Sequence, residues 1–453
     1  MAELVRPRPT REAPTVPVPT PPPGPVPAPV VRTPAWDLLL VCVAVYLATS
    51  IGRLHQLFPI LGLLKPALLA TLLAAGLYLL QQSGRRSMGL LRSPMTTCML
   101  GLLVWGGLSV PFALHQGTAF QFWTDYARTI LMALVIAGSV RGTLDLKRLI
   151  LVYFAVTVVY TAVVLSRFQL GADSWRLGRL YNYDANDLAT LIASAMPLGL
   201  YFVLGHRRLA MRILATAGLA VLLVGMIRSG SRGGFIALLA VVGFVLLGFT
   251  TVPARARLTG FVAILAVVVG AASDRYWTQM QTMLNPHEDY NLTSDAGRLQ
   301  IWERGLGYMA AHPLMGVGGQ NFGVAEGTIS PLARRQERGI GVRWGAAHNT
   351  FIQVGAELGV PGLLLFIGLI ATAFRSLRRV ARQSARAGPV AADFSRLAHA
   401  LTAALIGFVV GSFFLSLAYM DILYTLVAFT LALAKVARNA DGQRVPLPRR
   451  ARI

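Results

Sequence analysis

The chain has 453 residues, of which 55% are hydrophobic and only 13% are charged. Soluble proteins carry about 25% charged residues, so this chain has too little polar surface for water, and a soluble fold is excluded. The formal net charge of +23 does not indicate nucleic-acid binding, because the basic residues stand in short clusters between apolar stretches, a pattern typical of cytoplasmic loops in membrane proteins.

The first segment, residues 1–35, is rich in proline, with three in succession at Pro21, Pro22 and Pro23. It has too little apolar area to offset the entropy lost on ordering, so the sequence predicts a disordered cytoplasmic tail. Proline-rich tails can also bind partner domains, but we favour a solvated tail.

Twelve apolar stretches follow, most of them close to the roughly 20 residues that a transmembrane helix needs. They lie at 36–51, 57–80, 94–114, 120–140, 147–168, 186–205, 209–228, 233–251, 258–273, 350–373, 397–418 and 420–436. Prolines inside them predict kinks at Pro66, Pro111, Pro197 and Pro361. Because lipid offers no partners to backbone polar groups, the stretches must be helices. The sequence predicts an all-α polytopic membrane protein with about twelve spans, nine in 36–273 and three in 350–436.

The connections between these stretches alternate in basic charge. Beginning with the N-terminal tail, alternate connections hold 27 of the 42 lysines and arginines, whereas the opposite connections hold 13. The other two, Lys65 and Arg128, lie within the apolar stretches. Since short cytoplasmic loops carry an excess of Lys and Arg, we expect a multi-pass protein of a bacterial inner membrane. Both termini, including the basic tail 437–453, are then cytoplasmic. The long loop 274–349, between the ninth and tenth spans, is periplasmic.

Two short outer connections contradict this charge rule. Arg167, Arg176 and Arg179 precede the sixth span, where pairing with carboxylates such as Asp173 or Asp184 would suffice to explain them. The alternative is a functional need for positive charge on the outer side, and both readings stay open.

The other exception is the turn before the eighth span, Ser229-Gly230-Ser231-Arg232-Gly233-Gly234, which also follows Arg228. Its small residues let backbone N–H groups approach an anion, and a helix begins immediately afterwards. A helix N-terminus combined with a guanidinium fork is well suited to phosphate. The turn therefore predicts an anion site that contains Arg232.

The long loop 274–349 contains three recognisable parts. Residues 296–311 have Leu299, Trp302, Leu306 and Met309 at helical spacing, which predicts an amphipathic helix on the membrane face. A glycine-rich turn follows at 312–319, in which we interpret the histidine as structural. The loop ends with His348 and Asn349 directly before the tenth span.

The succession SRGG, GRLQIW, HPLMGVGGQNF and HNTFIQVGAELG resembles the O-antigen ligase and polymerase superfamily. The stretch Asp184-Ala185-Asn186-Asp187-Leu188-Ala189 is similar to a further element of that family, with Ala185 where proline is usual. The resemblance covers roughly residues 150–370. It implies transfer of glycans from undecaprenyl-pyrophosphate carriers at the periplasmic face of the inner membrane.

The resemblance also implies roles for particular residues. Arg232 and Arg298 would bind the donor pyrophosphate and stabilise the charge that develops as it leaves. His348 would be the catalytic base for the acceptor hydroxyl, although a histidine at a helix start is often only a cap. Supporting residues would be Arg179, Asn186 and Asn349. No cluster of acidic residues and histidines has metal-ligand spacing on the outer side, so we expect a metal-independent enzyme without a cofactor.

The sequence therefore predicts an integral-membrane glycosyltransferase, and we favour a polysaccharide polymerase for O-antigen or exopolysaccharide. Alternatives are an O-antigen ligase that acts on lipid A core and a protein O-oligosaccharyltransferase. The expected partners are the undecaprenyl-pyrophosphate-linked glycan donor, a glycan or lipid A core acceptor and membrane lipids, with no nucleic acid. A lipid-linked glycan transporter or flippase is the alternative of another class. It should show matched halves and broken helices at the midplane, and matched halves are not visible.

Overall fold

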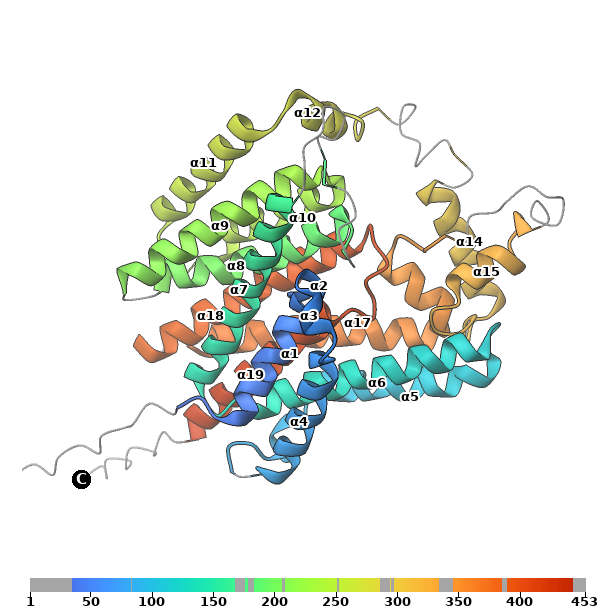
Figure 1. Ribbon diagram of the computed structural model, residues 1–453, viewed down its shortest axis with the longest axis horizontal. Helices are drawn as coiled ribbons and strands as arrows, with labels where there is room; N and C mark the ends of the chain where they lie inside the picture. Colours follow the sequence, from blue (N-terminus) through green and yellow to red (C-terminus); the bar gives the residue numbers. More distant parts are fainter. Residues whose placement is uncertain are drawn as a thin grey trace, which may run out of the picture. The chain divides into compact units, whose positions relative to one another are not determined.

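The computed structural model describes residues 35–82, 84–167, 176–177, 183–205, 208–250, 252–285, 294, 297–333, 345–384 and 389–442. Within these ranges the regular secondary structure is helical (Figure 1). The helices are α1 (Leu38–Ser50), α2 (Leu54–Leu57), α3 (Pro59–Gly62), α4 (Pro66–Leu80), η1 (Met88–Leu91), α5 (Pro94–Ser109), η2 (Val110–Phe112), α6 (Gln116–Ser139), α7 (Thr143–Arg167), α8 (Ala185–Gly205), α9 (Leu209–Ser229), α10 (Arg232–Gly248), α11 (Ala254–Ala271), α12 (Asp274–Gln281), α14 (Arg298–Ala311), α15 (Phe322–Thr328), α17 (Thr350–Ser384), α18 (Pro389–Ser412) and α19 (Asp421–Gly442).

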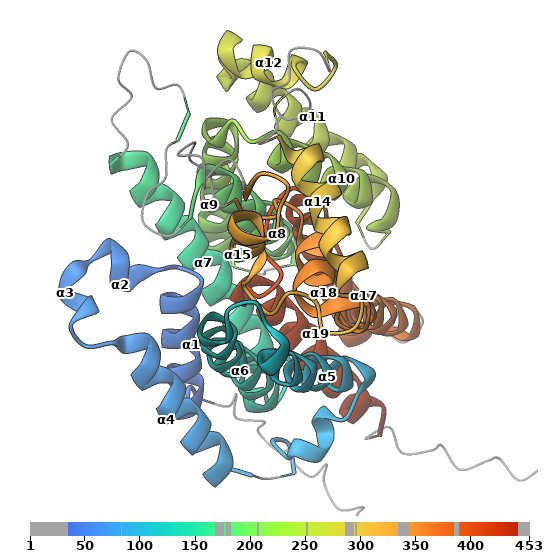
Figure 2. The same ribbon diagram turned by 90° about the vertical axis from the view of Figure 1, so that its right-hand side faces the viewer.

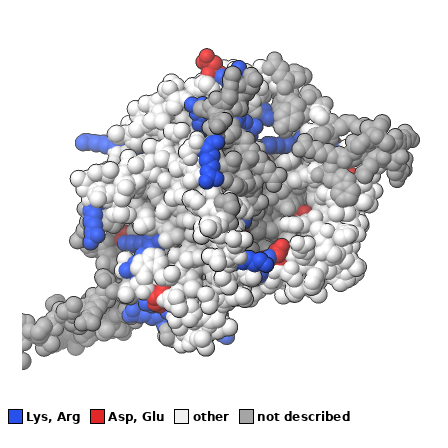
Figure 3. All heavy atoms as spheres, in the orientation of Figure 1, with Lys and Arg blue, Asp and Glu red and all other residues white. Residues whose placement is uncertain are grey.

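Each apolar stretch found in the sequence overlaps at least one helix, and the stretch 57–80 is divided among α2, α3 and α4. In the described ranges, seven helices are long and apolar enough to cross a membrane, namely α5 with η2, α7, α8, α9, α11, α17 and α18. The apolar helices α1, α4 and α10 are shorter. The face drawn in Figure 3 is mostly uncharged, as expected where lipid is the solvent. The protein is a polytopic helical membrane protein, as predicted, while the count of twelve spans stays a prediction.

The helix α8 is central to the packing of the second half of the chain. It packs against α7, α9, α10 and α18, and most of its residues are buried. By contrast, α11 contacts α9 and α10 sparsely, and Val268 is its one buried residue. Figure 1 shows α8, α9, α10 and α11 side by side. In Figure 2, α14 and α15 lie beside α17, whose first half they contact.

An ion-pair cluster joins helix ends that are far apart in the sequence. The Asp37 carboxylate pairs with Arg86 and Arg141, and the buried Asp145 carboxylate pairs with Arg141 and Arg148. The sequence places all five residues at the cytoplasmic ends of their spans. Their proximity supports the alternation of the connections between two sides, although which side is cytoplasmic stays a prediction.

The four prolines predicted to kink helices take different positions. Pro66 begins α4, where a missing N–H costs nothing, and Pro111 lies in η2 just after α5. Pro197 lies inside α8, and Pro361 lies inside α17 directly after a break. At Gly359 the backbone has φ 70° and ψ −173°, so α17 consists of two helices that meet at a kink.

A glycine-rich segment occupies the break in α17. The Val317 N–H donates to the Ala356 carbonyl at 2.8 Å, and the Gly318 N–H donates to the Glu357 carbonyl at 3.0 Å. In an unbroken helix these carbonyls would accept from residues four positions later, and one of those, Pro361, has no N–H. The segment therefore replaces the missing helical hydrogen bonds and fixes the loop before α15 to the break.

Candidate functional site

A small polar cavity lies among the starts of α8, α10 and α14, with α12 and the α18–α19 connection beside them. Its volume is about 80 Å³, room for several water-sized groups at roughly 10–15 Å³ each. The described lining residues are Arg176, Asn186, Gly230, Ser231, Arg232, Gly233, Gln279, Arg298, Phe414 and Leu415. The cavity thus contains both arginines that the sequence predicts to bind pyrophosphate.

The turn between α9 and α10 shapes one wall of this cavity. Gly230 has φ 56°, a left-handed conformation that ends α9 and that glycine adopts without strain. The Ser231 hydroxyl then accepts a hydrogen bond from the Gly234 N–H at 3.1 Å, which caps the start of α10. A Cβ on Gly234 would lie 2.5 Å from the Ala189 Cβ, so glycine permits the close approach of α10 to α8. The N-terminus of α10 therefore borders the cavity.

Arg232 is the first residue of α10, and its side chain is half-buried. One terminal nitrogen of its guanidinium donates to the Thr282 hydroxyl at 2.9 Å. This bond connects α10 to the residue directly after α12, the helix that contributes Gln279 to the cavity. The α12 segment therefore both orients Arg232 and closes one side of the site.

Arg176 connects three parts of the chain at the cavity. Its Nε donates to the Ser229 carbonyl at 2.7 Å, and a terminal nitrogen donates to the Asn186 side-chain oxygen at 2.8 Å. The next residue, Leu177, is buried, and its N–H donates to the Arg228 carbonyl at 2.8 Å. The connection before α8 is thereby joined to the end of α9.

The start of α8 has its own cap. The Asp184 carboxylate accepts from the backbone N–H groups of Asn186 and Asp187 at 2.7 and 2.8 Å. Asp184 therefore caps the N-terminus of α8, and its pairing with an outer arginine stays a prediction. Asp173, the other carboxylate considered, lies outside the described residues.

The preceding residue, Tyr183, is buried, and its hydroxyl donates to the Ile51 carbonyl at 3.2 Å. Burial raises the pKa of the Tyr183 phenol above its ordinary value. The phenol therefore stays a hydrogen-bond donor over the physiological pH range. It anchors the 183–187 segment to the end of α1.

The electrostatics of the cavity favour an anion. Three guanidinium groups line it, and none of its described lining residues is acidic. Positive charges around a common space attract an anion. Guanidinium groups also bind phosphate oxygens with bidentate, charge-assisted hydrogen bonds. The site can therefore accept a phosphate-type group.

His348 lies beside this cavity without being one of its lining residues. It has φ 48°, an uncommon conformation for a residue with a side chain, and its N–H donates to the Ser416 hydroxyl at 2.9 Å. Leu415, which lines the cavity, is the neighbour of Ser416, and its carbonyl accepts from the Thr350 hydroxyl at 2.8 Å. The 414–416 segment thus connects the start of α17 to the cavity.

Asn349 has a structural position. It is buried, and its side-chain oxygen accepts from the N–H groups of Phe351 and Ile352 at 2.9 and 3.1 Å. It therefore caps the start of α17 and fixes the backbone on which His348 stands.

A second polar cluster supports the segment between α12 and α17. Arg304 of α14 donates to the buried Glu326 carboxylate of α15 at 2.7 Å, and the Tyr308 hydroxyl donates to the same carboxylate at 2.7 Å. Burial and the hydrogen bond to Glu326 raise the pKa of Tyr308 above its ordinary value. The cluster holds α14, and with it Arg298, against α15.

Comparison with known proteins shows which family the region around the site resembles. A family model described as O-antigen ligase matches residues 217–367, which run from α9 to the first part of α17 and include Arg232, Arg298 and His348. This part of the chain, about a third of its length, is therefore similar to the O-antigen ligase family.

A relative, the exopolysaccharide production protein ExoQ of Rhizobium meliloti (strain 1021), is 31% identical over 216 residues. The match covers 43% of this chain and 48% of the relative. The chain thus spans about half the length of the curated relative that it matches.

The structure brings Arg232, Arg298 and Asn186 together, and it places His348 and Asn349 near them through the 414–416 segment. Arg179 lies outside the described residues. Arg176 was not chosen as a site residue from the sequence, although its position in an outer connection that opposes the charge rule was a usable signal. Gln279 and Phe414 carried no such signal, because only tertiary packing brings them to the cavity.

Proposed function

We propose that the protein is a glycosyltransferase that moves a glycan from an undecaprenyl-pyrophosphate carrier to an acceptor hydroxyl at the periplasmic face of the inner membrane. The observation that supports this most strongly is the convergence of Arg176, Arg232 and Arg298 on one cavity without an acidic lining residue among those described. A pyrophosphate carries several negative charges, and these three groups match it in charge and geometry.

The same residues can assist the reaction. As the bond between the anomeric carbon and the pyrophosphate oxygen breaks, the electron pair stays on the pyrophosphate, and charge grows on the departing oxygen. Arginines fixed by Ser229, Asn186 and Thr282 stabilise that charge without reorganising, which is often the largest contribution to catalysis.

His348 supplies the base in this proposal. Its neutral imidazole takes the proton of the acceptor hydroxyl as the oxygen attacks the anomeric carbon, and general-base catalysis of this kind contributes about 10²–10⁴-fold. Two observations support the role: the left-handed backbone conformation of His348, since strained backbone clusters at active sites, and its bond to Ser416 beside the cavity. In this proposal the reaction proceeds without a metal ion.

The acceptor is the glycan of a second carrier, which makes the protein a polymerase. The name of the relative, an exopolysaccharide production protein, favours this choice. A ligase that transfers to lipid A core is the second candidate, because the matching family model is described as O-antigen ligase.

One assay separates these functions. Purified full-length protein is given a carrier-linked repeat unit with and without lipid A core, and the products are resolved by size. A ladder of lengthening carrier-linked glycans without lipid A core supports the polymerase, and a product that appears only with lipid A core supports the ligase. Movement of intact donor across a vesicle membrane, without any new glycosidic bond, would instead indicate a transporter and contradict the proposal.

A further inference from the structure

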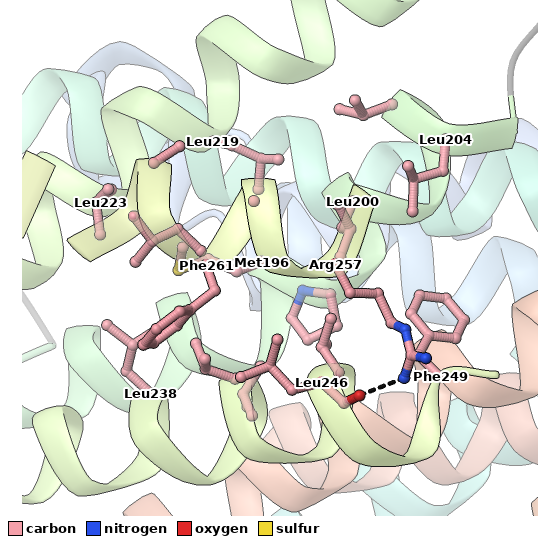
Figure 4. Close-up of a pocket in the computed structure, with 18 of the residues that line it drawn as sticks. Met196, Leu200, Leu204, Leu219, Leu223, Leu238, Leu246, Phe249, Arg257 and Phe261 are labelled. Atoms are coloured by element: carbon pink, nitrogen blue, oxygen red, sulfur yellow. Dashed lines mark hydrogen bonds between the residues drawn. The ribbon is translucent and has the colours of Figure 1, made fainter. Parts of the chain in front are cut away.

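A second cavity, of a different kind, lies between α8, α9, α10 and α11. Its volume is about 370 Å³, and apart from Arg257 and Thr216 its walls are apolar. Figure 4 shows side chains that include Met196, Leu223, Leu238 and Phe261 around it, with Arg257 at one end. We call it the apolar crevice.

The crevice exists because α11 packs loosely. Val268 is the one buried residue of α11, and several leucines and valines of that helix are exposed. Gly260 lines the crevice, and an added Cβ there would meet no atom within 4 Å. A volume above roughly 300 Å³ lies in the range of ligand sites, so the crevice is large enough for part of a lipid chain.

The crevice lies toward one end of the helices. On α10 its lining begins at Leu238, six residues after Arg232, which is about 9 Å along the helix at 1.5 Å per residue. At the opposite end it is lined by Phe249, Val252 and Arg257, all in or next to the α10–α11 connection. A lipid in the crevice would therefore have its head group at the α10–α11 end. That end lies away from the arginine cavity, the small polar cavity lined by Arg176, Arg232 and Arg298.

The charge at that end is positive. The sequence has no Asp or Glu between residues 188 and 273. Four arginines stand in or near the α8–α9 and α10–α11 connections, namely Arg208, Arg212, Arg255 and Arg257. Arg257 donates to the Leu246 carbonyl, and its buried Nε has no hydrogen-bond acceptor among the described residues. A buried N–H donor without a partner is unfavourable, and a phosphate oxygen would satisfy it.

We propose that the apolar crevice binds one anionic phospholipid from the leaflet at the α10–α11 end, with an acyl chain between α10 and α11 and the phosphate at Arg257. Basic pockets between transmembrane helices are suited to anionic head groups. This site is distinct from the arginine cavity and does not depend on the proposed enzymatic activity.

The test is lipid binding by the full-length protein in detergent, followed by mass spectrometry of the intact protein. The probes are phosphatidylglycerol and phosphatidylcholine with the same acyl chains. We expect the wild type to bind phosphatidylglycerol more tightly than phosphatidylcholine. In Arg257→Gln the ratio of the two affinities should fall about fivefold, the factor expected for one arginine near an anionic head group.

Two glycines of α11 provide a matched pair. Neither Gly260 nor Gly270 has an atom within 4 Å of an added Cβ, but only Gly260 is among the residues lining the crevice. Gly260→Leu should fill the crevice and reduce binding of both lipids at least fivefold, whereas Gly270→Leu should bind as the wild type does.

Equal binding by Gly260→Leu and Gly270→Leu would overturn the proposal, and so would an unchanged head-group preference in Arg257→Gln. A wild-type crevice occupied by a polyprenyl phosphate, and not by phosphatidylglycerol, would also overturn it. If Gly260→Leu does not fold, the head-group preference of Arg257→Gln compared with that of the wild type still tests the proposal.

Discussion

The guanidinium of Arg176 donates to the side-chain oxygen of Asn186 at 2.8 Å, at the edge of the cavity that also contains Arg232 and Arg298. The bond joins an outer connection to the first turn of α8, so the start of α8 and one wall of the cavity are fixed together. Arg176 is therefore both a ligand candidate and the residue that positions Asn186.

The first prediction concerns Arg176. Arg176→Lys keeps the charge but cannot donate to both Ser229 and Asn186, as the guanidinium does. Hydrogen bonds to charged groups contribute about 1.5–3 kcal/mol, so we expect affinity for the lipid-linked donor to fall about tenfold or more. Arg275→Lys is the control, because Arg275 is an exposed outer arginine that does not line the cavity. Equal donor affinity in the two variants would remove Arg176 from the site.

The second prediction concerns the two arginines identified from the sequence. Arg232→Lys should be seriously impaired in donor binding, because an ammonium group lacks the bidentate fork of a guanidinium. Arg298→Ala should weaken donor binding while the protein still folds and inserts. Both are measured as donor dissociation constants of purified protein, with Arg275→Ala as the reference. Wild-type affinity in both variants would contradict the assignment of pyrophosphate to this cavity.

The third prediction concerns the break in α17. A Cβ on Gly359 would lie 2.2 Å from the Leu314 carbonyl oxygen, and the residue has φ 70°. Gly359→Ala combines backbone strain with a clash, and each costs about 1–3 kcal/mol. We expect its thermal unfolding midpoint in detergent to fall by several degrees, whereas Gly270→Ala, in open space, should be neutral. A Gly359→Ala protein as stable as the wild type would show that the break does not require glycine.

The fourth prediction is the orientation of the chain. Single cysteines at Arg208 and Arg382 should be labelled only from the cytoplasm, and one at Thr328 only from the periplasm, in a background without Cys42 and Cys98. All three positions are exposed, which makes them suitable reporters. Glu326 is less suitable, because it is buried and paired with Arg304. Labelling of Thr328 from the cytoplasm alone would contradict the periplasmic placement of the site.

Much of the helical architecture could be predicted from the sequence, because lipid leaves helices as the available structure for long apolar stretches. Local signals also indicated the turn that we propose binds an anion, since Gly230, Ser231 and Arg232 are adjacent in the chain. The helix predicted at 296–311 corresponds to α14. Its buried residues are Ile301, Gly305 and Tyr308, and Leu299, on the predicted apolar face, is exposed. The placement of this helix on the membrane face stays a prediction.

The face that a helix buries against protein is harder to predict than the helix itself. Hydrophobic spacing shows which residues are apolar but not which of two apolar faces meets protein and which meets lipid. The hydrogen bonds of Arg176 to Ser229 and of His348 to Ser416 were likewise inaccessible from the sequence, because they join residues 53 and 68 positions apart. The same holds for the pairing of the 317–318 backbone with the break in α17.

The proposed role of His348 as the general base of glycan transfer is tested most directly by the pH dependence of that transfer. It is measured in the wild type and in His348→Ala, with detergent-solubilised protein between about pH 5 and 9. A general base must be neutral, so wild-type activity should rise with pH as the imidazole loses its proton; an ordinary histidine does so near about 6.5. His348→Ala should lose that rise and, by the magnitude of general-base catalysis, about 10²–10⁴-fold of turnover, while donor affinity is largely retained. His312→Ala, in the same outer segment, should keep the rise. Near wild-type turnover in His348→Ala would contradict the account, and His348 would then be only part of the start of α17.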